Sequence, residues 1–181
     1  MITISEAVTL LRSGKIIAAP TESVYGLSVD PTNEDALQAL LDLKARNPSK
    51  GFIVVASNIE ALSSLIEPFT EEMASKIMPT WPGPCTWIVP ARPNLSSLLC
   101  GQHSSLAVRV TTHPVMKALC DAFGGALVST SANQEGRPPA RSLDELALAF
   151  ETCPPIVAGE LGDLASPTPI YDGLTGQVIR L

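Results

Sequence analysis

Aromatic and charged residues are scarce in this chain of 181 residues, and each shortage disfavours a class of protein. Only 4% of the residues are aromatic, whereas proteins that read single-stranded nucleic acid stack bases on aromatic rings. Charged residues make up 17% and the net charge is −6, which disfavours a surface that coats a duplex. Hydrophobic residues make up 45%, enough for a core built mainly from Ala, Val, Leu and Ile.

The few cysteines, histidines and tryptophans do not form a recognisable site. The four cysteines show no Cys-x-x-Cys spacing, so we expect them to be reduced and mostly buried. His103 and His113 lack the spacing of a metal pair, and His113 beside Pro114 is more typical of a helix cap. We expect Trp81 and Trp87 to pack in the core rather than to stack on bases, and we expect no protein-bound metal.

Long apolar runs and the common nucleotide motifs are also absent. No stretch approaches the ~20 apolar residues that cross a bilayer, and the first residues lack a signal-peptide pattern. There is no Gly-x-x-x-x-Gly-Lys-[Ser/Thr] phosphate loop and no Gly-x-Gly-x-x-Gly. The length suits one domain, residues 1–181. We therefore expect a single-domain, cytoplasmic protein without membrane contact.

Capping signals and apolar periodicity predict the helices. Capping boxes start at Thr3, Ser57 and Ser142, each with a glutamate three residues later. Further helices are predicted over residues 33–44, 70–78 and 114–123, and Gly14 ends the first helix.

Short apolar runs between these helices predict strands. The predicted strands cover residues 15–19, 52–56, 85–89, 106–110 and 126–128, and residues 171–178 resemble a hairpin. In the run 106–110, Arg109 should project from the face opposite Leu106, Val108 and Val110. Because strands alternate with helices, the sequence predicts a single-domain α/β fold with a twisted, mixed parallel and antiparallel sheet and flanking helices.

Two polar segments are unusual for connections in such a fold. Residues 20–27 (Pro-Thr-Glu-Ser-Val-Tyr-Gly-Leu) follow a strand directly, where α/β proteins place ligands, although a turn and a helix N-cap would use the same residues. Residues 44–51 carry Lys44, Arg46 and Lys50. Because like charges repel, this cluster suggests an anionic partner. The alternative, complementation of the helix dipole plus a solvated loop, explains Lys44 well, Arg46 partly and Lys50 poorly.

Arg109 and a serine-rich segment give two further candidates. A charge inside an apolar strand needs a partner, which is either a structural salt bridge or a ligand. Residues 129–133 (Ser-Thr-Ser-Ala-Asn) also follow a strand and lead into a Gly/Pro loop with two arginines, residues 136–142. These hydroxyls and amides suit phosphate oxygens, although a serine-rich turn before a capped helix remains the alternative.

Taken together, these segments resemble the YrdC-like family of threonylcarbamoyl-AMP synthases in its short bacterial form. The matching motifs are Pro20-Thr21-Glu22-Ser23-Val24-Tyr25-Gly26-Leu27, Lys44-x-Arg46 with Lys50-Gly51, Trp81-Pro82-Gly83-Pro84-Cys85-Thr86, Leu106-Ala107-Val108-Arg109 and Ser129-Thr130-Ser131-Ala132-Asn133. The resemblance implies a sheet that lines a deep, positively charged cavity. It also implies an enzyme that forms threonylcarbamoyl-AMP and pyrophosphate from L-threonine, bicarbonate and ATP. Partner proteins would then transfer the threonylcarbamoyl group to position 37 of tRNA.

The resemblance also implies roles for individual residues, with Mg²⁺ accompanying ATP. The catalytic residues would be Lys44 and Arg46, and we expect their truncation to remove most turnover while leaving the fold intact. The implied ATP-binding residues are Lys44, Arg46, Lys50, Ser105, Ser131, Asn133, Arg141 and Arg180. The implied threonine-binding residues are Thr21, Arg109, Ser129 and Thr168.

Two other interpretations compete with the synthase. Some relatives have been described as RNA-binding or ribosome-maturation modules, and a cationic cavity could give weak RNA binding. The acidic net charge and the few aromatics argue against that alternative. A carbamoyl-transfer domain of a hydrogenase-maturation protein is the third interpretation, but the Cys-rich zinc segments of those larger proteins are absent.

Overall fold

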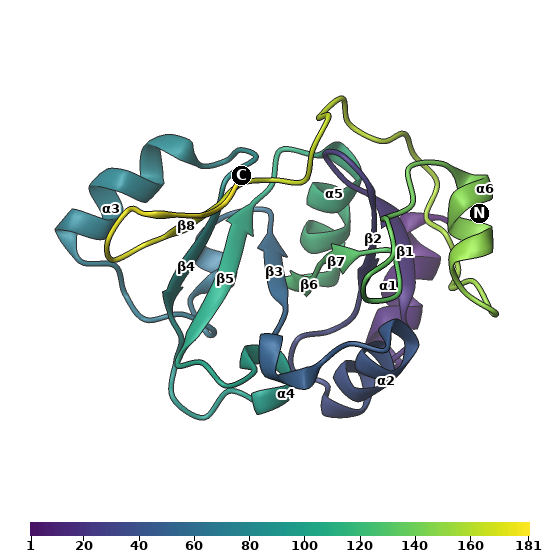
Figure 1. The fold of residues 1–181 in the computed structure, drawn as a ribbon, viewed down its shortest axis with the longest axis horizontal. Helices are drawn as coiled ribbons and strands as arrows, with labels where there is room; N and C mark the ends of the chain where they lie inside the picture. Colours follow the sequence, from purple (N-terminus) through teal and green to yellow (C-terminus); the bar gives the residue numbers. More distant parts are fainter.

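Two β-sheets form the framework of the computed structural model, which describes residues 1–181. The strands are β1 (Ile17–Pro20), β2 (Tyr25–Ser28), β3 (Ile53–Ala56), β4 (Thr86–Pro90), β5 (Ser105–Val110), β6 (Leu127–Val128), β7 (Thr130–Ser131), β8 (Ile170–Asp172) and β9 (Val178–Arg180). The larger sheet has the order β6-β3-β5-β4-β8-β9, and the smaller one has the order β1-β2-β7 (Figure 1). The larger sheet mixes parallel pairs, such as β3 with β5, and antiparallel pairs, such as β4 with β5, so the predicted fold class is confirmed.

The chain passes from one sheet to the other through a single residue, Ser129. This residue separates β6, at the edge of the larger sheet, from β7, at the edge of the smaller one. Its amide donates to the Ile53 carbonyl at 2.9 Å, and three residues later the Ala132 amide donates to the Tyr25 carbonyl. The serine-rich segment is therefore held at the junction of the two sheets.

Five of the six α-helices, all except α4, begin where the sequence predicts them. They are α1 (Ile4–Arg12), α2 (Glu34–Lys44), α3 (Glu71–Ile77), α4 (Ser97–Cys100), α5 (Pro114–Phe123) and α6 (Leu143–Ala149), with short 3₁₀ helices at Pro48–Lys50, Glu60–Leu62 and Met78–Thr80. Thr3 and Glu6 form the complete capping box of α1, and Ser13 with Gly14 ends that helix. The Asn33 and Thr70 side chains cap α2 and α3. None of the helices combines the length and the apolar character of a membrane-spanning segment.

Several local predictions were wrong. Ser57 does not start a capping box, because the Asn58 side chain accepts the Ala61 amide and only a 3₁₀ helix follows. At α6 the Ser142 hydroxyl caps as predicted, but the glutamate three residues later accepts from Arg141 instead of Ser142. His113 occupies the cap position of α5 without a capping side-chain bond. The sequence also gave no sign of β2, β7 or α4.

The core lies on both sides of the sheets. One cluster packs α1 and α5 against β1, β3 and β6. A larger cluster packs α2 and both tryptophans against the other face, so the core role predicted for Trp81 and Trp87 is confirmed. All four cysteines are free, with Cys100 and Cys120 buried and the other two half-buried. Leu106, Val108 and Val110 are buried in the larger cluster, which leaves the opposite face of β5 for Arg109.

Candidate active site

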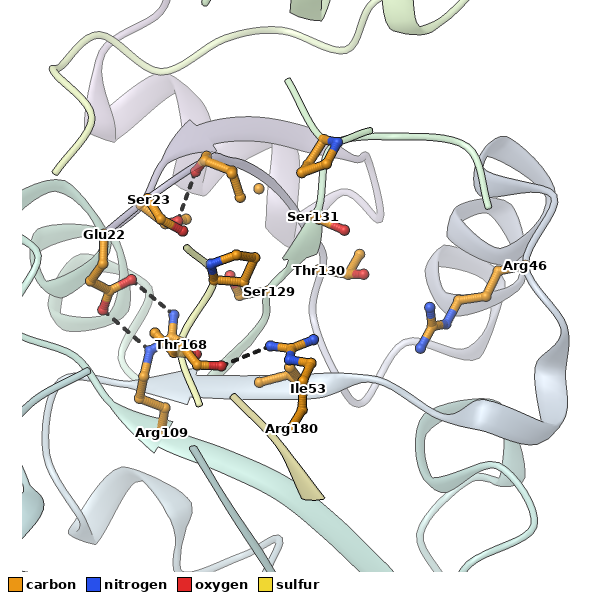
Figure 2. Close-up of a pocket in the computed structure, with 15 residues that line it drawn as sticks. Glu22, Ser23, Arg46, Ile53, Arg109, Ser129, Thr130, Ser131, Thr168 and Arg180 are labelled. Carbon is orange, nitrogen blue, oxygen red and sulfur yellow. Dashed lines mark hydrogen bonds and ion pairs between the residues drawn. The ribbon is translucent and has the colours of Figure 1, made fainter. Parts of the chain in front are cut away.

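A polar cavity of about 270 Å³ opens between the two sheets (Figure 2). Its walls come from both sheets, the loop after α2 and the segment that precedes β8. The lining residues are Thr21, Glu22, Ser23, Val24, Gly26, Arg46, Ile53, Arg109, Ser129, Thr130, Ser131, Pro139, Pro167, Thr168 and Arg180. Segments that are far apart in the sequence and carry the quoted motifs therefore meet in one place.

A second cavity of about 220 Å³ adjoins the first and shares Arg46, Ile53 and Arg180 with it. Lys50 and Ser105 line this second cavity. Three cations, Arg46, Lys50 and Arg180, thus gather around the junction of the two cavities in a chain whose net charge is −6. A local cluster of positive charge in a chain of negative net charge favours the binding of an anion.

The first motif forms the tight turn between β1 and β2 rather than the start of a helix. The Thr21 amide and hydroxyl both donate to the Val24 carbonyl, at 3.2 and 2.7 Å. Gly26 lets the hairpin approach the serine-rich segment, because a Cβ there would lie 3.0 Å from the Thr21 methyl and 3.3 Å from the Ser129 hydroxyl. The turn therefore presents Thr21, Glu22 and Ser23 to the cavity.

Arg109 and Glu22 form a buried, two-pronged ion pair. The Arg109 Nε donates to Glu22 Oε1 at 3.2 Å and its Nη2 donates to Oε2 at 3.0 Å, while both side chains are less than a tenth exposed. The Thr111 hydroxyl also donates to Oε1, at 2.6 Å. Burial by itself would raise the pKa of Glu22, but the Arg109 charge and the Thr111 hydrogen bond outweigh it, so the pKa is lowered and the carboxylate is ionised.

Thr168 connects this pair to a second arginine. Its hydroxyl accepts from Arg109 Nη1 at 3.2 Å and lies 3.0 Å from the Thr86 hydroxyl. Its carbonyl accepts from Arg180 Nη2 at 2.8 Å (Figure 2). Burial is the larger cause that lowers the pKa of Arg180 from its usual value, and the positive charge of Arg109 lowers it further.

Arg46 points its guanidinium toward the cavity from the loop after α2 (Figure 2). Nε and Nη2 donate to the Gly51 carbonyl at 3.2 and 2.9 Å, and the guanidinium carbon lies 5.4 Å from the centre of the Phe52 ring. These contacts fix the side chain and leave Nη1 without a protein acceptor, which suits an anionic ligand. Burial lowers the pKa of Arg46, against the opposing effect of Glu135.

Lys50 is an exposed cation that already has a partner. Its ammonium pairs with Glu135, and that carboxylate also accepts the Asn47 amide at 2.8 Å. This ion pair ties the loop after α2 to the segment after β7. A phosphate bound by Lys50 would have to share the ammonium with Glu135 or displace this carboxylate.

Lys44, to which the resemblance assigns ATP binding and catalysis, is a buried residue at the end of α2. It is only 2% exposed, and its ammonium donates to the carbonyls of Ser131 and Asn133, at 2.7 Å for Asn133. Lys44 lines neither cavity, so its direct contacts hold the serine-rich segment in place. Burial, and then the nearby Arg46 charge, lower the pKa of Lys44 to about 7, against the opposing effect of Glu135.

Replacing Lys44 by methionine should remove a pH-dependent contribution to stability. Because this lysine has a pKa of about 7 when folded and about 10.4 when unfolded, the unfolded chain binds more protons between these values. The contribution to the free energy of unfolding therefore rises with pH across that window, by at most ~1.4 kcal/mol per pH unit. Urea unfolding between about pH 7 and pH 9 should show a smaller rise for Lys44→Met than for the parent chain. Equal rises would show that the pKa of Lys44 is not lowered.

The remaining candidate residues divide between the cavities. Thr21, Arg109, Ser129 and Thr168 meet in the first cavity, together with Ser131. Asn133 and Arg141 instead line a separate cavity of about 640 Å³, which touches the first only through Pro139. The Arg141 guanidinium donates to the Ala165 and Leu164 carbonyls, at 2.8 and 3.2 Å.

Several polar residues of the site were not assigned a role from the sequence. Glu22, Thr86 and Thr111 surround the Arg109 guanidinium, and Thr130 lines the first cavity. Glu22 could have been singled out as the one carboxylate in the motif of residues 20–27, where it lies between Thr21 and Ser23. The structure holds no cluster of three or more His, Cys, Asp or Glu side chains suited to a metal ion.

Comparison with known proteins assigns the family. The Sua5/YciO/YrdC family model, described as "Telomere recombination", matches residues 9–180. Proteins named threonylcarbamoyl-AMP synthase from Coxiella burnetii and Methylococcus capsulatus are each 47% identical to this chain, over 98% and 96% of it and over 96% and 94% of their own lengths. The crystal structure of P. abyssi Sua5 complexed with L-threonine matches with a TM-score of 0.84 and 26% identity, over 93% of this chain and 50% of that one. The chain is therefore a member of the Sua5/YciO/YrdC family, as its ordered motifs predicted.

Proposed function

We propose that this chain is a threonylcarbamoyl-AMP synthase, which makes threonylcarbamoyl-AMP and pyrophosphate from L-threonine, bicarbonate and ATP. Support comes from the 47% identity to synthases matched over nearly their whole length. Downstream transfer proteins would then use the product to modify position 37 of tRNA. The observation that carries the proposal is the arrangement of charge along the cavity.

That arrangement has two different ends (Figure 2). At one end lies the neutralised Arg109–Glu22 pair, and at the other lies Arg46, with Arg180 between them. The paired end suits an amino acid, which carries a positive and a negative group. The cationic end, extended by Lys50 in the adjoining cavity, suits a polyphosphate. A cavity with these ends brings together the substrates of a synthase that joins an amino acid derivative to a nucleotide.

The first reaction step joins threonine and bicarbonate. A nitrogen–carbon bond forms between the deprotonated amine and the bicarbonate carbon, water leaves, and the product is a carbamate with a new carboxylate. Arg109 would bind the α-carboxylate of threonine, with Thr21, Ser129 and Thr168 along the same wall. Holding both reactants in one small cavity supplies the orientation that this step needs.

The second step transfers the adenylyl group. A carbamate oxygen attacks the α-phosphorus of ATP, the bond to the bridging oxygen breaks, and pyrophosphate leaves. Two anions must approach each other, so the protein contributes mainly cations and hydrogen-bond donors rather than a strong base. Arg46, Lys50 and Arg180 would neutralise the phosphates, and Ser131 lines the first cavity together with Arg46 and Arg180. Lys44 would act by holding the Ser131–Asn133 backbone in position.

Mg²⁺ would arrive with ATP as part of the substrate. Glu22 is the one carboxylate among the residues that line the first cavity, and Arg109 already holds it. We therefore assign Mg²⁺ to the phosphates and to water, and we assign no residue of the chain as its ligand.

The experiment that tests the proposal uses purified protein without RNA. ATP, Mg²⁺, L-threonine and bicarbonate should together give pyrophosphate release, and omission of threonine or bicarbonate should reduce it to background. With serine in place of threonine, kcat/KM should fall by at least about five-fold, because the cavity loses contact with one methyl group, worth ~1 kcal/mol or more. Release that continues without threonine contradicts the proposal. If RNA also binds tightly at physiological salt, an RNA-binding module replaces the synthase.

A further inference from the structure

One hydrogen-bond donor and one acceptor remain open in the Arg109–Glu22 pair. A guanidinium carries five N–H donors, and Arg109 uses four of them, two on Glu22 and one each on Thr86 and Thr168. A carboxylate offers about four acceptor positions, and Glu22 uses three, two for Arg109 and one for Thr111. The open donor is on Nη2 and the open acceptor is on Oε2, the two atoms joined by the 3.0 Å bond.

The geometry points to Glu22 as the residue that selects a free α-amino group in the substrate. This inference rests on the proposed use of threonine. A zwitterionic α-amino acid carries its carboxylate and its ammonium on one carbon atom, the α-carbon. It can therefore place the carboxylate on the open donor of Arg109 and the ammonium on the open acceptor of Glu22, both of which line the cavity. Glu22 is thus a specificity-determining residue that touches the substrate.

The backbone of Glu22 is built to hold this position. Its carbonyl accepts the Leu164 amide at 3.0 Å, and the Thr21 carbonyl accepts the Gly162 amide at 2.9 Å. A Cβ at Gly162 would lie 2.6 Å from the Glu22 carbonyl oxygen, so only glycine lets the segment around residue 162 pack this closely against the turn. The carboxylate is consequently presented from a fixed backbone rather than from a loose loop.

The same charge directs the intermediate toward ATP. The bound ammonium must first lose its proton to solvent. Carboxylation of the neutral amine by bicarbonate, with loss of water, then gives an anionic carbamate, which Glu22 repels. Arg180 and Arg46 lie along the cavity in the direction away from Glu22 (Figure 2). Glu22 therefore favours the amine before the first step and disfavours the carbamate after it, which moves the new carboxylate toward the phosphates.

Equilibrium binding of two ligands to Glu22→Gln tests this role. L-Threonine has the amine, whereas (R)-3-hydroxybutyrate keeps the carboxylate, the hydroxyl and the methyl but lacks the amine. The parent chain should bind threonine at least about ten-fold more tightly than the analogue. Glu22→Gln should weaken threonine binding by about 10- to 100-fold and change the analogue's affinity by less than about three-fold. The matched control Glu151→Gln removes an exposed carboxylate outside the cavity and should change neither affinity.

The results of these binding measurements distinguish a wrong role for Glu22 from a wrong proposed function. If Glu22 merely positions Arg109, Glu22→Gln weakens both ligands equally, and the amine-selective role is overturned. If the variant does not fold, equal affinity of the parent chain for the two ligands overturns the role by itself. If the parent chain binds no threonine, the proposed function fails together with this inference.

Discussion

Arg46→Ala should lower kcat for threonine-dependent pyrophosphate release by about 30- to 1000-fold. The physical reason is that Nη1 remains free for a phosphate oxygen while Gly51 and Phe52 fix the rest of the guanidinium. Loss of a pre-positioned, charge-assisted contact that strengthens in the transition state costs ~2–4 kcal/mol. The melting temperature should change little, because the side chain is only half-buried and the lost contacts are worth ~1 kcal/mol.

A surface arginine supplies the control for Arg46. Arg92 makes an exposed ion pair with Glu67 and lines neither cavity, so Arg92→Ala should retain parent-like kcat. Steady-state kinetics with ATP varied at saturating threonine measure both variants. Parent-like kcat and KM in folded Arg46→Ala would remove this residue from the phosphate site.

Arg109→Ala should unfold far more easily than Arg46→Ala and should lose threonine binding. Removing Arg109 leaves the ionised Glu22 carboxylate buried without its counter-ion, which costs ~3–5 kcal/mol of the free energy of unfolding. The same substitution removes the proposed partner of the threonine carboxylate. Urea unfolding and threonine titration of one preparation measure the two effects, and ATP binding should suffer less than threonine binding.

A second substitution tests the cause of the instability. Combining Arg109→Ala with Glu22→Gln replaces the orphaned charge by a neutral amide, so the double variant should be more stable than Arg109→Ala alone. Threonine binding should remain lost in both. If the double variant is no more stable, the buried charge is not the source of the cost. If Arg109→Ala binds threonine like the parent chain, Arg109 is a structural residue only.

The elements with local signals were predictable from the sequence. Helix starts at Thr3, Asn33 and Thr70 follow from side chains that bond to amides three residues away. Alternation along 106–110 correctly separated Arg109 from the apolar face of its strand, and the ordered motifs identified the family. These features depend on spacing within a few residues, which a sequence shows directly.

The missed features depend on contacts between distant segments. Strand β7 has two residues and pairs with β2 more than a hundred positions earlier, so it carries no periodic signal. The resemblance implied that Lys44 contacts ATP, and nothing near it in the sequence indicated its acceptors, which are carbonyls 87 and 89 residues away. Glu22 and Arg109 are likewise 87 residues apart. The sequence identified the charge of Arg109 as needing a partner but left the partner open.

Mass spectrometry of the small-molecule product tests the central claim most directly. Purified chain is incubated with ATP, Mg²⁺, L-threonine and ¹³C-bicarbonate in the absence of RNA, and the product is compared with one made from unlabelled bicarbonate. The proposed chemistry predicts an AMP-linked threonine derivative whose mass rises by the one labelled carbon, formed together with pyrophosphate. An AMP product that lacks threonine or the labelled carbon, or no nucleotide product at all, would contradict it.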